Sequence, residues 1–234
     1  MPLDTYANLC ATVARWLERS DLSADIPDFI ALAEAKINDR LRVFQMESTA
    51  TLTGGFITLP PTVIVDEITG ADLTDEDSGA ILTDETVAVS TMTLPDDFLE
   101  LRFVTANTNP KINLTLASPG MTIADYSGLS GIPYVYTIAA GNMIVYPATT
   151  ETVALTYYAK IPPLSDANPT NWLLARWPNI YLYAALLEGS VIQFEDQRAA
   201  GFDLLLDKAI AAAHMSDIGT RWGNAGLRLR GPTP

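Results

Sequence analysis

Acidic side chains are concentrated in one stretch of the sequence that contains neither lysine nor arginine. Alternating acids beside a glycine, as at Asp75, Asp77 and Gly79, can chelate calcium, but the glycine comes too early for an EF-hand and no glutamate closes the loop. Nothing in the spacing singles out a carboxylate pair of the kind that cleaves glycosides. Three interpretations stay open: a solvated, self-repelling loop, a calcium site, and an acidic surface that faces a basic partner or lines a channel. The acids of the stretch are Asp66, Glu67, Asp72, Asp75, Glu76, Asp77, Asp84 and Glu85, and the last six form the candidate channel or surface segment.

Other residue types that carry catalysis or bind metals are scarce. His214 is the single histidine and Cys10 the single cysteine, so no histidine and cysteine ligand set and no disulfide framework can form within the chain. We expect His214 in the last turn of a helix, where the helix dipole favours it, and Cys10 as a small apolar residue of a helix. No P-loop, dinucleotide fingerprint or G-x-S-x-G elbow is present. The sequence therefore favours a protein without enzyme activity, cofactor or metal over the alternatives that stay open.

The C-terminal segment departs from the acidic trend. Cationic and apolar residues alternate there between glycines, and no helix or strand pattern is visible. A disordered terminus is one interpretation. The other is a docking arm that becomes ordered on a partner, because tryptophan and arginine are enriched at binding hot spots. The candidate docking residues are Arg221, Trp222, Leu227, Arg228, Leu229 and Arg230.

Composition places these groups on a globular, strongly acidic chain. The 234 residues are 48% hydrophobic and 18% charged, with a formal net charge of −14. Such a charge argues against binding nucleic acid through its phosphates, because that affinity comes from lysine and arginine. It is compatible with a surface that repels DNA and lets it slide. We expect a protein made in the cytosol, without a signal peptide or a membrane-spanning run.

Helical periodicity marks both ends of the chain. Apolar residues at helical spacing predict helices over about 4–19 and 25–41, the second with Pro27 in its first turn. Helices return over about 178–193 and 195–216, after a turn at 171–175. The run 180–187 is apolar almost all round, which is typical of a helix buried on most sides. We expect this helix, with Trp172 and Trp177 at its entry, to be the centre of a bundle.

Between the helices the period changes to two. Short strands are expected over 56–59, 62–66, 80–82, 86–94, 100–105, 112–116, 134–138, 143–146 and 153–158, with a short helix over 118–126. Their spacing is typical of an antiparallel sandwich or barrel. The order helices, strands, helices predicts an α+β protein with a β-rich domain inserted into a helical bundle. The expected parts are a helical hairpin at 1–42, a β-rich domain at 43–164, bundle helices at 165–217 and an extended arm at 218–234.

An ordered series of short motifs resembles the head–tail adaptor proteins of tailed bacteriophages, of the tail-tubular type. The motifs are SDL at 20–22, IPDFIALAEA at 26–35, LPDDFLELR at 94–102, GIPY at 131–134, LTYYAKIPPLSD at 155–166, the run 165–190, and the arginine-rich tail after Trp222. Together they cover most of the chain. One departure is a possible insertion near 61–91, since ITLP at 57–60 is nearly repeated as MTLP at 92–95.

The resemblance implies a structural virion protein at the head–tail junction. It implies a homo-oligomeric ring, typically of twelve copies, that binds the portal protein above and a tail nozzle or tail tube protein below. Double-stranded DNA would pass through the ring without specific binding, for genome retention and ejection, and no membrane is involved.

Two other functions remain open from the residues alone. The β-rich segment could be a carbohydrate- or ligand-binding sandwich on a helical scaffold, with Tyr126, Tyr134, Tyr136 and Tyr146 stacking on sugar. A hydrolase that uses Asp75 and Asp77 is the third hypothesis.

Overall fold

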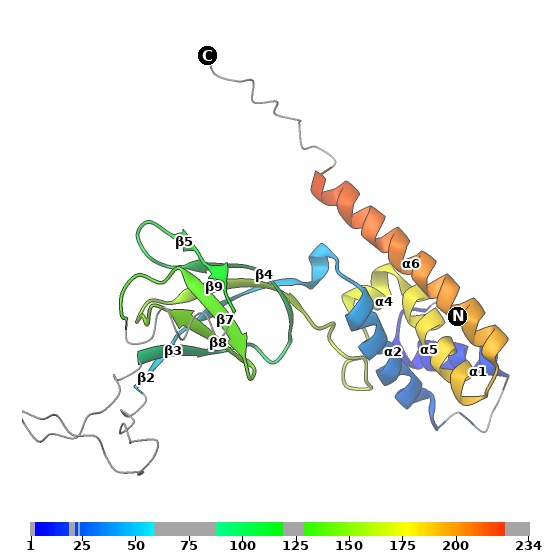
Figure 1. The fold of residues 1–234 in the computed structure, drawn as a ribbon. Helices are drawn as coiled ribbons and strands as arrows, with labels where there is room; N and C mark the ends of the chain where they lie inside the picture. Colours follow the sequence, from blue (N-terminus) through cyan, green and yellow to red (C-terminus); the bar gives the residue numbers. More distant parts are fainter. Residues whose placement is uncertain (1–2, 19–21, 23, 59–87, 119–128, 223–234) are drawn as a thin grey trace, which may run out of the picture. The chain divides into compact units, whose positions relative to one another are not determined.

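The structure, a computed structural model, describes residues 3–18, 22, 24–58, 88–118 and 129–222. The chain divides into two compact units (Figure 1): residues 1–47 with 159–234, which we call the helical unit, and residues 48–158, which we call the sheet unit. The predicted α+β class is confirmed, since helices fill the first unit and two sheets fill the second.

The helical unit contains α1 (Tyr6–Leu17), α2 (Ile26–Arg40), the single turn η1 (Phe44–Met46), α4 (Trp172–Arg176), α5 (Pro178–Ile192) and α6 (Asp196–Trp222). Side-chain caps fix two of the starting points. The Thr5 hydroxyl accepts a hydrogen bond from the Asn8 amide at 3.3 Å, and the Asn171 side chain accepts one from the Leu174 amide at 2.8 Å. The predicted helices are present, and the turn expected at 171–175 is the short helix α4.

Helix α5 is the most buried element of this unit. It contacts α1, α2, α4 and α6, and Ile180, Tyr181 and Leu186 are fully buried. At Gly189 a Cβ atom would lie 2.9 Å from Leu17 Cδ1, so this glycine allows α1 to approach closely. These contacts are the ones expected for an apolar helix that has no solvent face.

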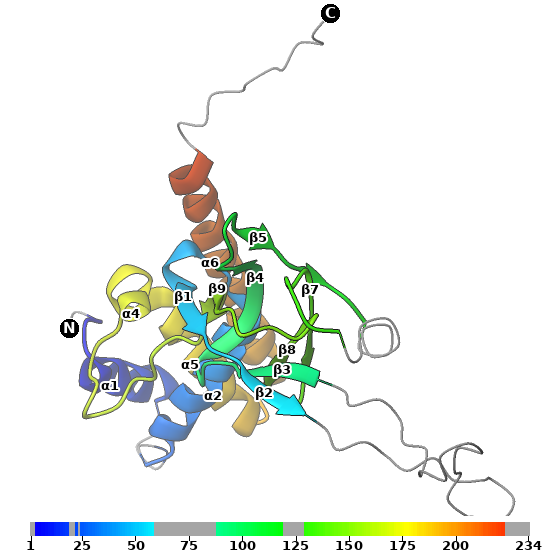
Figure 2. The same cartoon turned by 90° about the vertical axis from the view of Figure 1, so that its left-hand side faces the viewer.

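The sheet unit holds two sheets (Figure 2). The first has the order β1-β9-β4-β5 and the second the order β2-β3-β8-β7-β6. The strands are β1 (Glu47–Leu52), β2 (Gly55–Thr58), β3 (Ala88–Thr93), β4 (Phe98–Ala106), β5 (Ile112–Asn113), β6 (Thr115–Leu116), β7 (Val135–Ala139), β8 (Asn142–Tyr146) and β9 (Val153–Ala159). Met92, Val104, Met143 and Leu155 are buried in this unit.

Two parts of the strand prediction are wrong. No barrel is closed among the described strands, and β6 pairs with β7 in parallel rather than antiparallel. Strand β1 was not expected, because ESTATL has a single large apolar residue and no clear alternation. The strands expected at 62–66 and 80–82 lie outside the described residues, and so does the helix expected at 118–126 except for its first residue, Ser118.

The hairpin of β2 and β3 brackets the acidic stretch. Thr58 pairs with Ala88, so the segment 59–87 leaves and re-enters the sheet at neighbouring positions. Ser90, inside the possible insertion near 61–91, belongs to the sheet: it pairs with Val145 of β8 and is fully buried. Its hydroxyl donates to the Thr149 carbonyl at 2.7 Å and accepts from the Thr149 amide at 2.8 Å.

Candidate functional site

The predicted site residues fall mainly outside the described part of the chain. This holds for the acids Asp72, Asp75, Glu76, Asp77, Asp84 and Glu85, and for Leu227, Arg228, Leu229 and Arg230 of the arm. Helix α6 includes Arg221 and Trp222, so residues 218–222 are helical and not part of an extended arm as expected. The docking and channel roles stay predictions. The described residues show how the base of the C-terminal segment is held.

Arg221 lies in a polar cluster near the end of α6. Its Nε atom is 3.0 Å from Asp217 Oδ2, one helical turn earlier, and its guanidinium donates a hydrogen bond to Glu47. The Arg221 side chain is 21% exposed. An arginine with two carboxylate partners and little exposure orients the end of the helix. This arginine therefore stabilises the fold at the base of the predicted arm.

Asp217 and His214 also hold the chain that leaves α2. Asp217 Oδ1 accepts a hydrogen bond from the Phe44 amide at 2.8 Å, and His214 Nε2 accepts one from the Arg42 amide at 3.1 Å. In this contact the Nε2 atom is the acceptor, and an imidazole nitrogen accepts a hydrogen bond only when it carries no proton. The expected last-turn position of His214 is wrong, because α6 continues to Trp222. We call residues 41–47 the outgoing segment.

Arg176 joins the short helix α4 to the same region. Its guanidinium carbon lies 4.6 Å from the centre of the Trp177 ring and 6.0 Å from that of Phe44. Trp172 and Trp177 contact each other edge to face, with 6.3 Å between ring centres. These cation–π and aromatic contacts position the entry of α5 against the outgoing segment.

The chain that returns to the helical unit is held in the same way. We call residues 159–164 the return segment. Glu34 Oε1 accepts hydrogen bonds from the Leu164 amide at 2.7 Å and the Tyr181 hydroxyl at 3.2 Å. Asn38 Oδ1 accepts one from the Ile161 amide at 3.0 Å. Asn171 Nδ2 donates to the Pro162 carbonyl at 2.8 Å and to the Tyr181 oxygen at 2.6 Å.

Burial perturbs the two titratable members of this network. Burial is the largest cause that raises the pKa of Glu34, against the lowering effect of its two hydrogen-bond donors. Burial also raises the pKa of Tyr181, and the nearby Glu34 carboxylate raises it further. Both side chains are buried, Glu34 at 9% and Tyr181 at 0% exposure. The network fixes a backbone segment and is closed to substrate.

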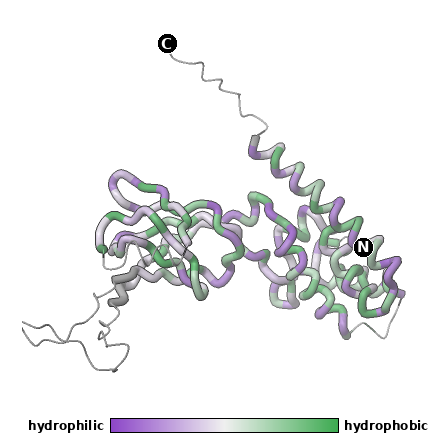
Figure 3. The backbone as a smooth tube through the Cα atoms, in the orientation of Figure 1, coloured by the Kyte–Doolittle hydropathy of each residue, from purple (hydrophilic) through white to green (hydrophobic). Residues whose placement is uncertain are grey.

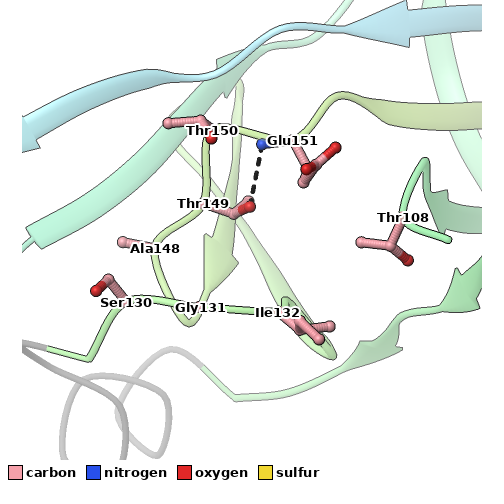
Figure 4. A pocket seen from close by; sticks show the side chains of 8 residues that line it. All are labelled: Thr108, Ser130, Gly131, Ile132, Ala148, Thr149, Thr150 and Glu151. Carbon is pink, nitrogen blue, oxygen red and sulfur yellow. Dashed lines mark hydrogen bonds between the residues drawn. The ribbon is translucent and has the colours of Figure 1, made fainter.

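The sheet unit has an open pocket that offers little for chemistry. Its volume is about 310 Å³ (Figure 4), and Glu151 is its single titratable side chain. The lining residues are Thr108, Ser130, Gly131, Ile132, Ala148, Thr149, Thr150 and Glu151. The Glu151 amide donates to the Thr149 hydroxyl at 3.0 Å, and no aromatic ring lines the wall.

The tyrosines proposed for sugar stacking do not form a platform. Tyr136 and Tyr146 are buried, at 7% and 2% exposure, while Tyr134 is 42% exposed. Tyr126 lies outside the described residues. A buried ring cannot stack on a ligand in solvent, so this part of the carbohydrate hypothesis is wrong for two of the four residues.

Metal and nucleophile candidates are equally limited. Across the described ranges, no group of three or more His, Cys, Asp or Glu residues could hold a metal ion. Cys10 is half-buried, and burial raises the pKa of its thiol, which disfavours the reactive thiolate. No helix among the described residues combines the length and the apolar character that a membrane crossing requires.

Comparison with protein families identifies the chain over nearly its whole length. The model of the family described as SU10 adaptor protein matches residues 4–230, which is nearly the whole chain. The match includes both units and most of the C-terminal segment. No curated protein sequence matches the chain.

Proposed function

The chain belongs to the SU10 adaptor protein family, whose members are structural proteins of bacteriophages, and we propose that it joins the portal to the tail at the head–tail junction. The observation that carries this proposal is the family match, which runs across both units rather than over one of them. In the proposed particle the chain forms a ring, typically of twelve copies, around the path of the DNA.

The charge of the chain supports a place beside DNA. A net charge of −14 on each copy gives a ring a strongly negative surface. Phosphates and carboxylates repel each other over roughly 8–10 Å at physiological salt, which keeps the duplex from adhering to the channel wall. Eight of the 28 acidic residues of the chain lie in the segment 59–87. The β2–β3 hairpin fixes where that segment starts and ends.

The C-terminal end of α6 supports an arm that begins at a fixed place. Asp217 and Arg221 tie the last turns of α6 to the outgoing segment, through the Phe44 amide and Glu47. A segment that departs from a well-anchored helix loses less freedom when it docks than one that departs from a loose end. In our proposal, residues 223–234 contact the portal through their arginines and leucines.

The pocket of the sheet unit and the described clusters of acidic residues offer little for catalysis. The pocket of the sheet unit has one titratable group, and no metal cluster lies within the described ranges. A structural adaptor needs surfaces and fixed segments rather than a reactive centre, and those are the features that the described residues contain.

Electron microscopy of the phage particle tests the proposal. We expect density for the chain as a ring between the portal and the tail. Phage that lack the chain should fill their heads and then lose DNA, because no tail closes the portal. Particles in which the chain is absent from that junction, or particles that keep their tails and DNA without it, would contradict the proposal.

A further inference from the structure

Helix α6 presents an apolar stripe to solvent on the side opposite its core contacts. Its buried face consists of Leu206, Ala209, Ile210 and Ala213. On the outer side, Leu204, Met215 and Ile218 are 56%, 69% and 52% exposed. Lys208 and Ala211 are exposed between them. Figure 3 shows hydrophobic and hydrophilic residues alternating along this helix to its end.

The stripe has the spacing of a coiled-coil seam. Leu204, Lys208, Ala211, Met215 and Ile218 follow one another at intervals of four, three, four and three residues. Positions at this spacing line up along one side of a helix and receive the side chains of a second helix. An exposed apolar seam of this length indicates a helical partner that is absent from the isolated chain.

A matching seam lies on α2 of the same unit. Asp28, Leu32, Ala35 and Asp39 are exposed and follow one another at intervals of four, three and four residues. Leu32 is 51% exposed in the middle of this seam. Both α2 and α6 turn their buried faces toward α5, so the two seams face away from the core of their own chain.

The charges of the two seams are complementary. The α6 seam carries one cation, Lys208, and the α2 seam carries one aspartate near each end. A carboxylate is therefore available to Lys208 whichever way the two helices run. Copies that each carry a net charge of −14 repel one another. The opposite-charge pair in the proposed interface is attractive and offsets part of that repulsion.

We propose that α6 of one copy packs along its outer seam against the outer seam of α2 of a second copy. The two surfaces differ, so the contact is head to tail and leaves one seam of each kind open for the next copy. Such contacts close into a ring when the rotation between copies allows it. This inference rests on the proposed function and names the contact between neighbouring adaptors.

Photo-crosslinking in phage particles tests the partner. A photoreactive amino acid replaces Met215 in the full chain, and the particles are purified and irradiated. We expect a covalent product of two chains of 25.3 kDa each. Trypsin should release the α2 peptide 20–36 joined to the peptide 209–221 that carries the photoreactive residue.

The possible results separate two failures. A chain that is absent from particles overturns the proposed function, and this inference falls with it. A chain that is present but crosslinks at position 215 to another virion protein, to a different part of a second copy, or to nothing, overturns the inference and leaves the proposed function standing.

Charge exchange gives a second test without a photoreactive group. Lys208→Asp should reduce the incorporation of the chain into particles at least tenfold, while its melting temperature stays unchanged. Combining it with Asp28→Lys and Asp39→Lys should restore incorporation. Lys111→Asp makes the same charge change at an exposed lysine of the sheet unit and should have no effect. Equal incorporation for Lys208→Asp and Lys111→Asp, or no restoration by the exchange, would overturn the proposed contact.

Discussion

Glu34 is the most informative single residue for testing how the helical unit holds the return segment. Its carboxylate accepts hydrogen bonds from the Leu164 amide at 2.7 Å and from the Tyr181 hydroxyl at 3.2 Å. Glu34→Ala leaves both donors without this acceptor. A buried donor without a partner costs about 1–3 kcal/mol, and the hydroxyl oxygen keeps its hydrogen bond from Asn171. Removing the carboxylate also removes the cost of burying its charge, which offsets part of the lost stability.

We therefore expect Glu34→Ala to lower the free energy of unfolding by about 2 kcal/mol near neutral pH. For a chain of this size that corresponds to a melting temperature lower by about 4–8 °C. Glu34→Gln keeps an oxygen acceptor for the Leu164 amide and removes the charge, so its effect should be within about 1 kcal/mol of the parent. The pair separates the lost hydrogen bonds from the lost charge.

The pKa of Glu34 gives the comparison a direction in pH. Burial raises this pKa above its ordinary value of 4.5, so the folded state binds the proton more tightly than the unfolded state does. The stabilisation from this group is fully present below about pH 4.5 and is lost as the pH rises through the folded-state pKa. Glu34→Gln does not titrate. The parent should therefore lose stability relative to Glu34→Gln between pH 4.5 and pH 7.5.

Urea denaturation followed by far-ultraviolet circular dichroism at pH 4.5, 6 and 7.5 measures these differences. Tyr181→Phe serves as the matched control. It removes the hydroxyl that donates to Glu34 and leaves the hydrogen bond from the Leu164 amide to Glu34 in place. Two results would refute the reasoning: a Glu34→Ala protein as stable as the parent, or a parent that gains stability relative to Glu34→Gln as the pH rises.

Three further changes test other parts of the structure. Asp217→Ala should lower the free energy of unfolding by about 1–3 kcal/mol, because the Phe44 amide loses its acceptor, whereas Asp217→Asn should cost less than about 1 kcal/mol; equal denaturation midpoints for the two would contradict this. Deleting residues 223–234 should leave the melting temperature unchanged and abolish incorporation into particles, and a truncated chain that still joins them would exclude the docking arm. Replacing residues 59–87 by Asn-Gly should keep the circular dichroism spectrum and the melting transition, because the two ends meet on paired strands and this dipeptide forms a tight hairpin turn; an unfolded or aggregated product would show that the segment supports the sheet.

The helices were predictable because their periodicity and their end signals agree. Pro27 and Pro178 occupy first turns, and the apolar stripes reveal which faces are buried. The sequence pattern ends this helix at 216, since Gly219 and Thr220 are weak helix formers, whereas α6 continues to Trp222. Tertiary contacts override that preference, because the ion pairs of Arg221 with Glu47 and Asp217 stabilise the last turn of the helix.

The strands were harder to place for two physical reasons. Strand β1 has mainly polar and small residues, and its inclusion depends on pairing within the sheet rather than on its own pattern. The parallel pair β6–β7 joins Thr115 to Val135 across a connection whose direction no local signal encodes. Alternating apolar residues and turn residues predict that a strand exists. Which strand it pairs with is decided by the packing of the whole sheet.

No sequence motif marks the residues that hold the two connecting segments. Glu34, Asp217 and His214 are ordinary helix residues in their local patterns, and each accepts a hydrogen bond from a backbone amide more than 100 residues away. Backbone amides carry no sequence identity, so no motif can mark such a pair. One signal was available for Glu34: it lies on the apolar side of α2, between Ala33 and Ile37. A carboxylate on the buried side of an amphipathic helix needs a donor, because burial without one is costly. That requirement predicts that a partner exists, and only the fold identifies it as the return segment.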